Sequence, residues 1–245
     1  MSQILSPYFG PVKYIIAKIS ASLFGHDCAL CAGRSATSLV CPACIEALPH
    51  IARACPRCAI PLGTRGPYCG ECLAPDRHAF DDALAVFEYG FPIDRLVQRF
   101  KYAGDLALGS WLAARLAESA ALRPRPDLIV AAPLSARGLR RRGFNQALVI
   151  ARRVAGALRL RCDFDALRKV RETAPQQRLE RRQRIRNLQD AFECRIRFAG
   201  EHVAIVDDVI TTGATMDALA RALRECGAGR VSAWAVARTP DPAIR

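Results

Sequence analysis

The sequence contains no uninterrupted apolar run long enough to cross a bilayer, so we expect no membrane span. Residues 4–24 are fairly apolar, but prolines and lysines interrupt them. They also lack a basic lead-in and a small-residue cleavage site, which argues against a secretory signal. We therefore expect residues 1–27 to form a short amphipathic segment that covers the core.

Acidic residues are scarce in one part of the chain. Residues 133–186 contain 4 Asp or Glu against 16 Lys or Arg, so this block carries +12 of the formal net charge of +13. A basic block is often only solvated surface, but such a concentration also attracts polyanions. Aromatic residues are scarce there too, with only Phe144 and Phe164, so nucleic-acid binding would depend on charge more than on base stacking.

Cysteine, by contrast, is abundant. Eight of the 11 cysteines form four Cys-x-x-Cys motifs, with 9 or 10 residues between successive motifs. Two such motifs in tight turns can supply the four sulfurs of a tetrahedral metal site. Disulfides fit poorly with a chain that lacks a secretion signal, and redox chemistry normally needs only one motif. We therefore predict two structural Zn²⁺ ions, bound by Cys28, Cys31, Cys41, Cys44, Cys55, Cys58, Cys69 and Cys72.

The spacing leaves the pairing of the four motifs open. Successive motifs could pair to form two zinc ribbons in tandem, or the first could pair with the third and the second with the fourth. The remaining Cys162, Cys194 and Cys226 are scattered along the sequence, and burial or chance explains them better than metal binding does.

Strand and helix patterns alternate through residues 83–237, as expected for an α/β fold with a doubly wound, mostly parallel sheet. Short apolar runs predict strands over residues 83–89, 127–132, 203–206 and 231–236, and another strand is expected within 191–198. Helices are predicted from Pro92 to a break at Gly104, and over residues 106–122, 144–158 and 216–226. A length of 245 residues accommodates such a core together with a small appendage.

We divide the chain into the segment 1–27, a double zinc ribbon over 28–80 and the α/β domain over 81–240. Residues 78–82 are the predicted hinge between ribbon and domain. A polar tail that we expect to fray begins at Arg238. Residues 180–187, which follow the stretch 171–179, are helix-prone but almost wholly polar, so we expect them to be mobile and able to close over a bound substrate.

The rest of the chain is organised around residues 202–216, where a buried strand leads to acids, hydroxyls and one glycine. Ligands of open α/β sheets lie beyond the carboxyl ends of strands, and the N-terminus of a helix attracts anions. Asp207 and Asp208 would repel a phosphate, so they are better suited to binding sugar hydroxyls. We predict a phosphosugar pocket with this acidic pair as catalytic residues and a phosphate loop of Thr211, Thr212, Gly213, Ala214 and Thr215. The alternative is a buried strand, a solvated turn and a capped helix.

A second loop, rich in arginine, follows the predicted strand 127–132. Arginine forks can make two charge-assisted bonds to phosphate oxygens, so Arg137 and Arg142 are suited to a departing pyrophosphate. An exposed basic loop without a ligand is the alternative.

The stretch from Val206 to Thr215 resembles the phosphoribosyl pyrophosphate signature of the type I phosphoribosyltransferases. The chain from about residue 28 to 236 also resembles the ComF family of bacterial competence proteins. The ordered landmarks are the Cys-x-x-Cys module, Phe100-Lys101-Tyr102 with Gly104-Asp105, Arg142-Gly143-Phe144-Asn145-Gln146-Ala147, and Thr173, Gln176, Leu179, Arg184, Asn187 and Phe192. The chain departs from its relatives at Ala131-Ala132-Pro133-Leu134, where they often show a Val-Pro-Val-Pro-like string.

This resemblance implies a type I phosphoribosyltransferase-like fold in a cytoplasmic protein. Asp207 and Asp208 would hold the ribose hydroxyls, and residues 211–215 the 5′-phosphate. Residues 133–142 would face pyrophosphate and Mg²⁺, with Lys101, Asn145 and Gln146 on the same side. Some family members act in natural transformation, during which single-stranded DNA enters the cell.

Three functions are compatible with these features. The first is transfer of a phosphoribosyl group from phosphoribosyl pyrophosphate to an acceptor that no residue of the sequence identifies. The second is binding of single-stranded DNA, with the sugar-phosphate pocket serving binding or regulation without turnover. The third is a scaffold whose zinc ribbons dock a partner such as a DNA-translocating helicase.

Overall fold

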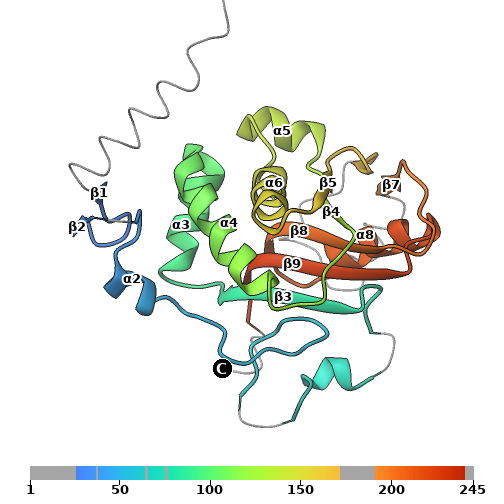
Figure 1. Ribbon diagram of the computed structural model, residues 1–245, viewed down its shortest axis with the longest axis horizontal. Coiled ribbons are helices and arrows are strands. Elements are labelled where there is room, and N and C mark those ends of the chain that lie inside the picture. The colour runs from blue at the N-terminus through green and yellow to red at the C-terminus, as the bar shows by residue number, and fades with distance from the viewer. Residues whose placement is uncertain (1–25, 37, 64–65, 75–76, 172–190, 241–245) are drawn as a thin grey trace, which may run out of the picture. The chain divides into compact units, whose positions relative to one another are not determined.

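The computed structural model describes residues 26–36, 38–63, 66–74, 77–171 and 191–240 (Figure 1). The expected amphipathic segment over 1–27 lies outside these residues except for its last two, and the predicted mobile segment over 180–187 lies wholly outside them. The chain divides into two compact units, and the boundary between them in the sequence lies between Leu48 and Pro49. No helix in the described part of the chain is both long and apolar enough to cross a membrane.

The first unit contains the first two Cys-x-x-Cys motifs. Strands β1 (His26–Asp27) and β2 (Arg34–Ser35) form an antiparallel hairpin, and α2 (Pro42–Glu46) follows, beginning with the proline that suits a first helical position. The hairpin turn and the start of α2 each carry one Cys-x-x-Cys motif, so the four sulfurs of this unit face one another.

The second unit is built on a five-stranded sheet in which all neighbouring strands are parallel. Its order is β3 (Asp82–Glu88), β9 (Arg230–Arg238), β8 (His202–Ile210), β4 (Leu128–Ala131) and β5 (Arg161–Asp163). Residues 203–206 of β8 and 231–238 of β9 are buried, as expected for strands covered on both faces. The predicted doubly wound α/β architecture is confirmed.

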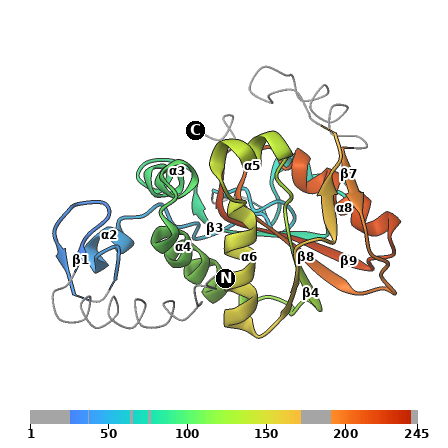
Figure 2. The same ribbon diagram turned by 90° about the horizontal axis from the view of Figure 1, so that it is seen from above.

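Helices cover both faces of this sheet (Figure 2). On one face α4 (Leu106–Ala120) packs against β3 and β9, and α6 (Gln146–Leu158) packs against β4 and β8, while α8 (Ala214–Glu225) packs on the other face against β8 and β9. A short antiparallel pair, β6 (Leu167–Lys169) with β7 (Phe192–Cys194), lies beside α8. It accounts for only part of the strand expected within 191–198.

Helix α3 (Ile93–Ala103) forms where predicted, because Ile93, Leu96, Val97 and Phe100 recur at helical spacing and are buried in the core. It ends at Gly104, whose φ of +67° favours glycine. Asp105 then caps α4 by accepting a hydrogen bond from the Leu108 amide at 3.1 Å. The two helices approach closely at Gly109, where an added Cβ would lie 2.3 Å from the Phe100 ring.

Two local predictions are wrong. Residues 136–142, expected to be loop, form the helix α5 (Ala136–Arg142), because Ser135 caps it through the Gly138 amide at 3.1 Å. Asp207 and Asp208 do not follow their strand but belong to it, since β8 continues to Ile210 and pairs with β9 along its whole length. Neighbouring β4 ends earlier, opposite Val206, so the two acids extend past it.

Residues 49–61 run along the free edge of β3. The Glu88 amide donates to the Pro49 carbonyl at 2.8 Å, and the Ile51 amide donates to the Val86 carbonyl at 3.0 Å. His50 and Phe87 form an antiparallel bridge between these two hydrogen bonds. The second pair of Cys-x-x-Cys motifs is therefore anchored directly to the α/β sheet, within the same compact unit.

Candidate functional site

The candidate site lies where the direction of the chain through the sheet reverses. After β4 the chain passes through α6 to β5 at one edge of the sheet, whereas after β8 it passes through α8 to β9 on the opposite side. The connections that leave β4 and β8 therefore diverge. Such a switch point is where open α/β sheets form a crevice at the carboxyl ends of their strands. Both predicted ligand loops, residues 133–142 and 211–215, begin at this point.

Asp208 is paired with a lysine from another element. The Lys101 Nζ, in the last turn of α3, lies 2.8 Å from Asp208 Oδ2. Burial alone would lower the pKa of Lys101, but the Asp208 carboxylate more than offsets it and raises the pKa overall. The lysine is therefore a fixed positive charge at the carboxyl end of β8. This contact joins two residues that the sequence placed on different sides of the ligand.

Asp207 is only half-buried by surface area, yet it lies in a strongly desolvated position. Its pKa is raised to about 8, first by burial and then by repulsion from Asp208, while Lys101 acts in the opposite direction. Its Oδ1 accepts a hydrogen bond from the Asp208 amide at 2.8 Å. The adjacent acids therefore differ: Asp208 has a cationic partner within ion-pair distance, and Asp207 favours its protonated form near neutral pH.

The predicted phosphate loop, residues 211–215, has a backbone geometry that suits binding of an anion. Gly213 is the N-cap of α8 and has a φ of +82°, a conformation that a side chain would strain. The Thr212 Oγ1 accepts a hydrogen bond from the Ala214 amide at 3.4 Å, and Thr211 is exposed. The loop thus presents hydroxyls and the positive end of a 12-residue helix at the mouth of the crevice.

The arginine side of the crevice is held together through Gln146, a buried residue in the first turn of α6. Its Oε1 accepts from Arg142 Nη1 at 3.0 Å, and its Nε2 donates to the Lys101 carbonyl at 3.4 Å. The structure therefore brings Lys101, Arg142, Gln146 and Asp208 into one connected group. The Nε of Arg142 is buried and has no hydrogen-bond partner among the described residues.

The other two residues predicted on this side have different positions. Asn145 caps α6 through the Ala147 amide at 3.0 Å and donates from Nδ2 to the Ala132 carbonyl at 3.0 Å, so it fixes the backbone where β4 ends. Arg137 is exposed in the first turn of α5.

Four residues beside the phosphate loop have no signal in the sequence: His78, Ala79, Asp217 and Arg238. His78, expected in a hinge, has its Nδ1 3.1 Å from Asp217 Oδ2, and its ring packs next to Gly213. The Ala79 amide donates to Asp217 Oδ1 at 2.8 Å. Arg238, expected to begin a fraying tail, is instead the last residue of β9 and only 3% exposed. Only long-range contacts identify these residues, and a local pattern could not.

The eight cysteines form two clusters, each made by two successive motifs. Cys28, Cys31, Cys41 and Cys44 form one cluster, and Cys55, Cys58, Cys69 and Cys72 form the other, with all sulfurs of a cluster within 4.8 Å of one another. The tandem pairing is therefore the correct one, and the alternating pairing is wrong.

Both clusters fit a tetrahedral zinc ion. A Zn–S distance of about 2.3 Å implies sulfurs about 3.8 Å apart. The observed separations are 3.8 Å for Cys31–Cys41 and 3.5 Å for Cys58–Cys69. Backbone amides donate to Cys28 Sγ and bring its pKa down to about 6 although burial opposes this, and a hydrogen bond from Cys58 lowers the pKa of Cys55 to about 4. The donor set is that of closed, structural zinc sites.

Comparison with known proteins agrees with this architecture. A phosphoribosyl transferase domain model matches residues 138–244, and a double zinc ribbon model matches residues 19–73. The chain is 34% identical over 206 residues to the DNA utilization protein YhgH of Salmonella typhi, covering 82% of this chain and 90% of the relative. It is 33% identical over 207 residues to the protein of the same name from Escherichia coli K12, with the same coverage.

Two further similarities are more distant. Competence protein F of Haemophilus influenzae is 29% identical over 231 residues, which cover 89% of this chain and 99% of that protein. A solved purine phosphoribosyltransferase from Pyrococcus horikoshii is 16% identical and covers 64% of this chain and 86% of its own, at a TM-score of 0.32, which is too low to support an inference. From the matched domains and the 34% relative, the chain belongs to the ComF family of competence-related proteins, in which a phosphoribosyltransferase-like domain carries a double zinc ribbon.

Proposed function

We propose that this chain binds phosphoribosyl pyrophosphate together with Mg²⁺ at the switch point between β4 and β8, and transfers the phosphoribosyl group to an acceptor. One observation carries the proposal: a charged pair, Lys101 and Asp208, lies at the carboxyl end of β8, the strand that leads into the glycine-containing N-terminus of α8. Acids for sugar hydroxyls and amides for a phosphate are therefore supplied by one continuous segment.

The two ends of the ligand would be held by different elements. The 5′-phosphate fits the hydroxyls of Thr211, Thr212 and Thr215 and the first amides of α8. The ribose hydroxyls fit Asp207 and Asp208, because ionised or neutral carboxyl groups can accept hydrogen bonds from them. The diphosphate fits the arginine side, where the buried Arg142 Nε lacks a partner. Mg²⁺ would neutralise the negative charge of the diphosphate. The carboxyl groups of Asp207 and Asp208 would serve as its protein ligands.

In the transfer step the bond between the anomeric carbon and the diphosphate oxygen breaks, and its electron pair leaves with the diphosphate. The acceptor forms a new bond to that carbon and loses a proton to solvent or to a nearby base. Positive charge develops on the ribose ring, and carboxylates beside the ring stabilise it. Lys101 and Arg142 stabilise the departing negative charge.

The test compares calorimetric binding of phosphoribosyl pyrophosphate with Mg²⁺ in the wild type and Asp208→Asn. We expect the wild type to bind, and the variant to bind about ten- to a hundredfold more weakly, as when a charge-assisted hydrogen bond is lost. Asp165→Asn is a matched control, because Asp165 forms an exposed ion pair with Arg195 on a different part of the domain. A wild-type protein that shows no binding with Mg²⁺ would refute the proposal.

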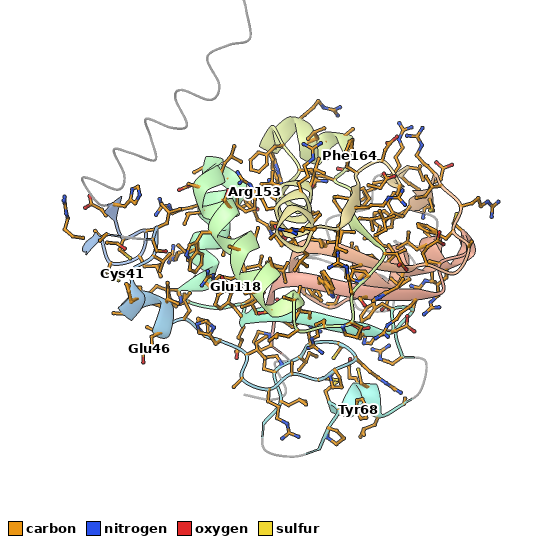
Figure 3. All side chains as sticks on the ribbon, in the orientation of Figure 1. Cys41, Glu46, Tyr68, Glu118, Arg153 and Phe164 are labelled. Atoms are coloured by element: carbon orange, nitrogen blue, oxygen red, sulfur yellow. The ribbon has the colours of Figure 1, made fainter. Side chains whose placement is uncertain are left out.

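A second candidate function is binding of single-stranded DNA, and one observation favours it. Phe164 is 60% exposed (Figure 3). The Arg152 guanidinium lies 4.7 Å from its ring centroid. An exposed aromatic ring backed by arginine is a stacking platform for a base. It belongs to the basic block of residues 133–186, whose charge favours a phosphate backbone. Docking of a helicase on the zinc ribbons, and a cytoplasmic location, remain predictions.

A further inference from the structure

The buried guanidinium of Arg238 joins the second cysteine cluster to the start of the phosphate loop. Its Nε donates to the Cys58 carbonyl at 2.9 Å. Its Nη1 donates to the Ile210 carbonyl at 3.2 Å and also hydrogen-bonds to the Thr211 carbonyl. A single side chain therefore holds a metal-ligand residue on one side and the last residue of β8, with its successor, on the other.

The charge of Arg238 needs the cluster. A guanidinium remains protonated, and burying one is costly unless negative charge and hydrogen bonds compensate for it. A zinc ion with four thiolates carries a net charge of −2, and Cys55, Cys58, Cys69 and Cys72 are all buried beside this arginine. With the metal bound, the cluster offers both a fixed carbonyl and a compensating charge. Without it, the compensating charge is lost.

The same ribbon reaches the phosphate loop by a second route. After the cluster the chain passes through His78 and Ala79, both of which contact Asp217 in the first turn of α8. The His78 ring is stacked on Phe80 at 4.6 Å and packs next to Gly213. The phosphate loop is therefore held from two sides by residues that the second ribbon positions.

We infer that Arg238 is a positioning residue that couples metal occupancy of the Cys55–Cys58–Cys69–Cys72 site to the conformation of the phosphate loop. Pinning the Ile210 and Thr211 carbonyls fixes the directions of the peptide groups that lead into Gly213, and hence of the amides that meet a phosphate. Because linkage is reciprocal, a phosphate ligand in the loop tightens the hold of this site on its metal. The part concerning the ligand rests on the proposed phosphoribosyl site.

The first experiment needs no ligand. Amide hydrogen exchange over residues 208–217 is measured in the full chain for the wild type, Arg238→Lys and Cys58→Ser, with Cys44→Ser in the other compact unit as the matched control. We expect exchange at residues 211–215 to rise at least tenfold in Arg238→Lys, although it retains two zinc ions, and in Cys58→Ser, but not in Cys44→Ser. Wild-type exchange in a two-zinc Arg238→Lys protein would overturn the inference.

The second experiment makes its main comparison in the unmodified protein, so that comparison does not depend on whether a variant folds. Zinc release to a chelator is followed with and without saturating ribose 5-phosphate. We expect the ligand to slow the loss of one of the two ions at least fivefold, and Arg238→Lys to abolish this protection. Equal release rates despite calorimetrically verified binding would overturn the coupling. If ribose 5-phosphate and phosphoribosyl pyrophosphate both fail to bind, the proposed function is lost, and the exchange experiment alone decides the role of Arg238.

Discussion

Lys101 Nζ and Asp208 Oδ2 lie 2.8 Å apart and join the C-terminus of α3 to the carboxyl end of β8. Their side chains are only 18% and 8% exposed, so neither charge is well solvated. Gln146 binds the backbone of Lys101 and the side chain of Arg142, and so extends this pair into the arginine side of the crevice. Cations and acids at the site are thus mutually dependent, and this dependence can be measured.

Lys101→Met is expected to lower the free energy of unfolding by about 3 kcal/mol, because it leaves the Asp208 carboxylate buried without its partner. Asp208→Asn should cost less, and the double variant should recover most of the loss, since both charges are then removed. Urea denaturation of the four proteins gives the coupling energy. Effects of the two substitutions that simply add would show that the pair does not stabilise the fold.

Asp207 gives a pH dependence whose sign follows from its raised pKa. The pKa is about 8 in the folded protein against 3.8 for the unperturbed group, so the folded state binds this proton more tightly. Its stabilising contribution is therefore complete below pH 4 and is lost as the pH rises through 8. Asp207→Asn should lack this loss. The melting temperature of the wild type minus that of the variant should therefore decrease as the pH is raised from 4 to 8. A difference that is constant across this range would contradict the assignment.

Gly213→Ala tests the phosphate loop. The substitution forces a side chain into a φ of +82° and should destabilise the protein by about 1–2 kcal/mol. Gly200 has a φ of +102° with open space around it, so Gly200→Ala imposes similar strain away from the loop. We expect only the variant at position 213 to lose affinity for phosphoribosyl pyrophosphate, at least tenfold by calorimetry. Equal loss in both variants would mean that the loop does not bind the phosphate.

Metal analysis should find two zinc ions in each chain, one for each cysteine cluster. Cys44→Ser and Cys58→Ser should each retain one ion, because each removes a ligand from a different closed site. Elemental analysis of the purified proteins measures this directly. Loss of both ions from either single variant would show that the two sites do not bind independently.

Phe164→Ala should weaken binding of single-stranded DNA about five- to a hundredfold, because it removes a stacking surface worth roughly 1–3 kcal/mol. Phe91→Ala is the control, since Phe91 is 78% exposed but lies outside the basic block. Fluorescence anisotropy at several salt concentrations should show that Phe164→Ala changes affinity and leaves the salt slope almost intact. Wild-type affinity that does not change with salt would argue against backbone binding.

The existence of β3, β4, β8 and β9 and of α3, α4, α6 and α8 follows from local patterns in the sequence, whereas their order in the sheet does not. Ile93, Leu96, Val97 and Phe100 recur at helical spacing, and Asp105 and Gly104 are cap residues whose preference is intrinsic. The extent of β8 does not follow in this way. Asp207 and Asp208 look like the end of a strand because acids disfavour strands, but pairing with β9 outweighs that preference.

The sequence by itself determined which chemical groups are present: eight cysteines at ribbon spacing, an acidic pair, a threonine–glycine loop and a block of arginines. Those features are visible because each depends on residues close together in the chain. Only the tertiary structure decided which cysteine motifs pair, that Lys101 faces Asp208, and that Arg238 is buried against Cys58, 180 residues away. The physical reason is that a buried charge is tolerated only where distant elements supply its partner, and no local pattern records where those elements meet.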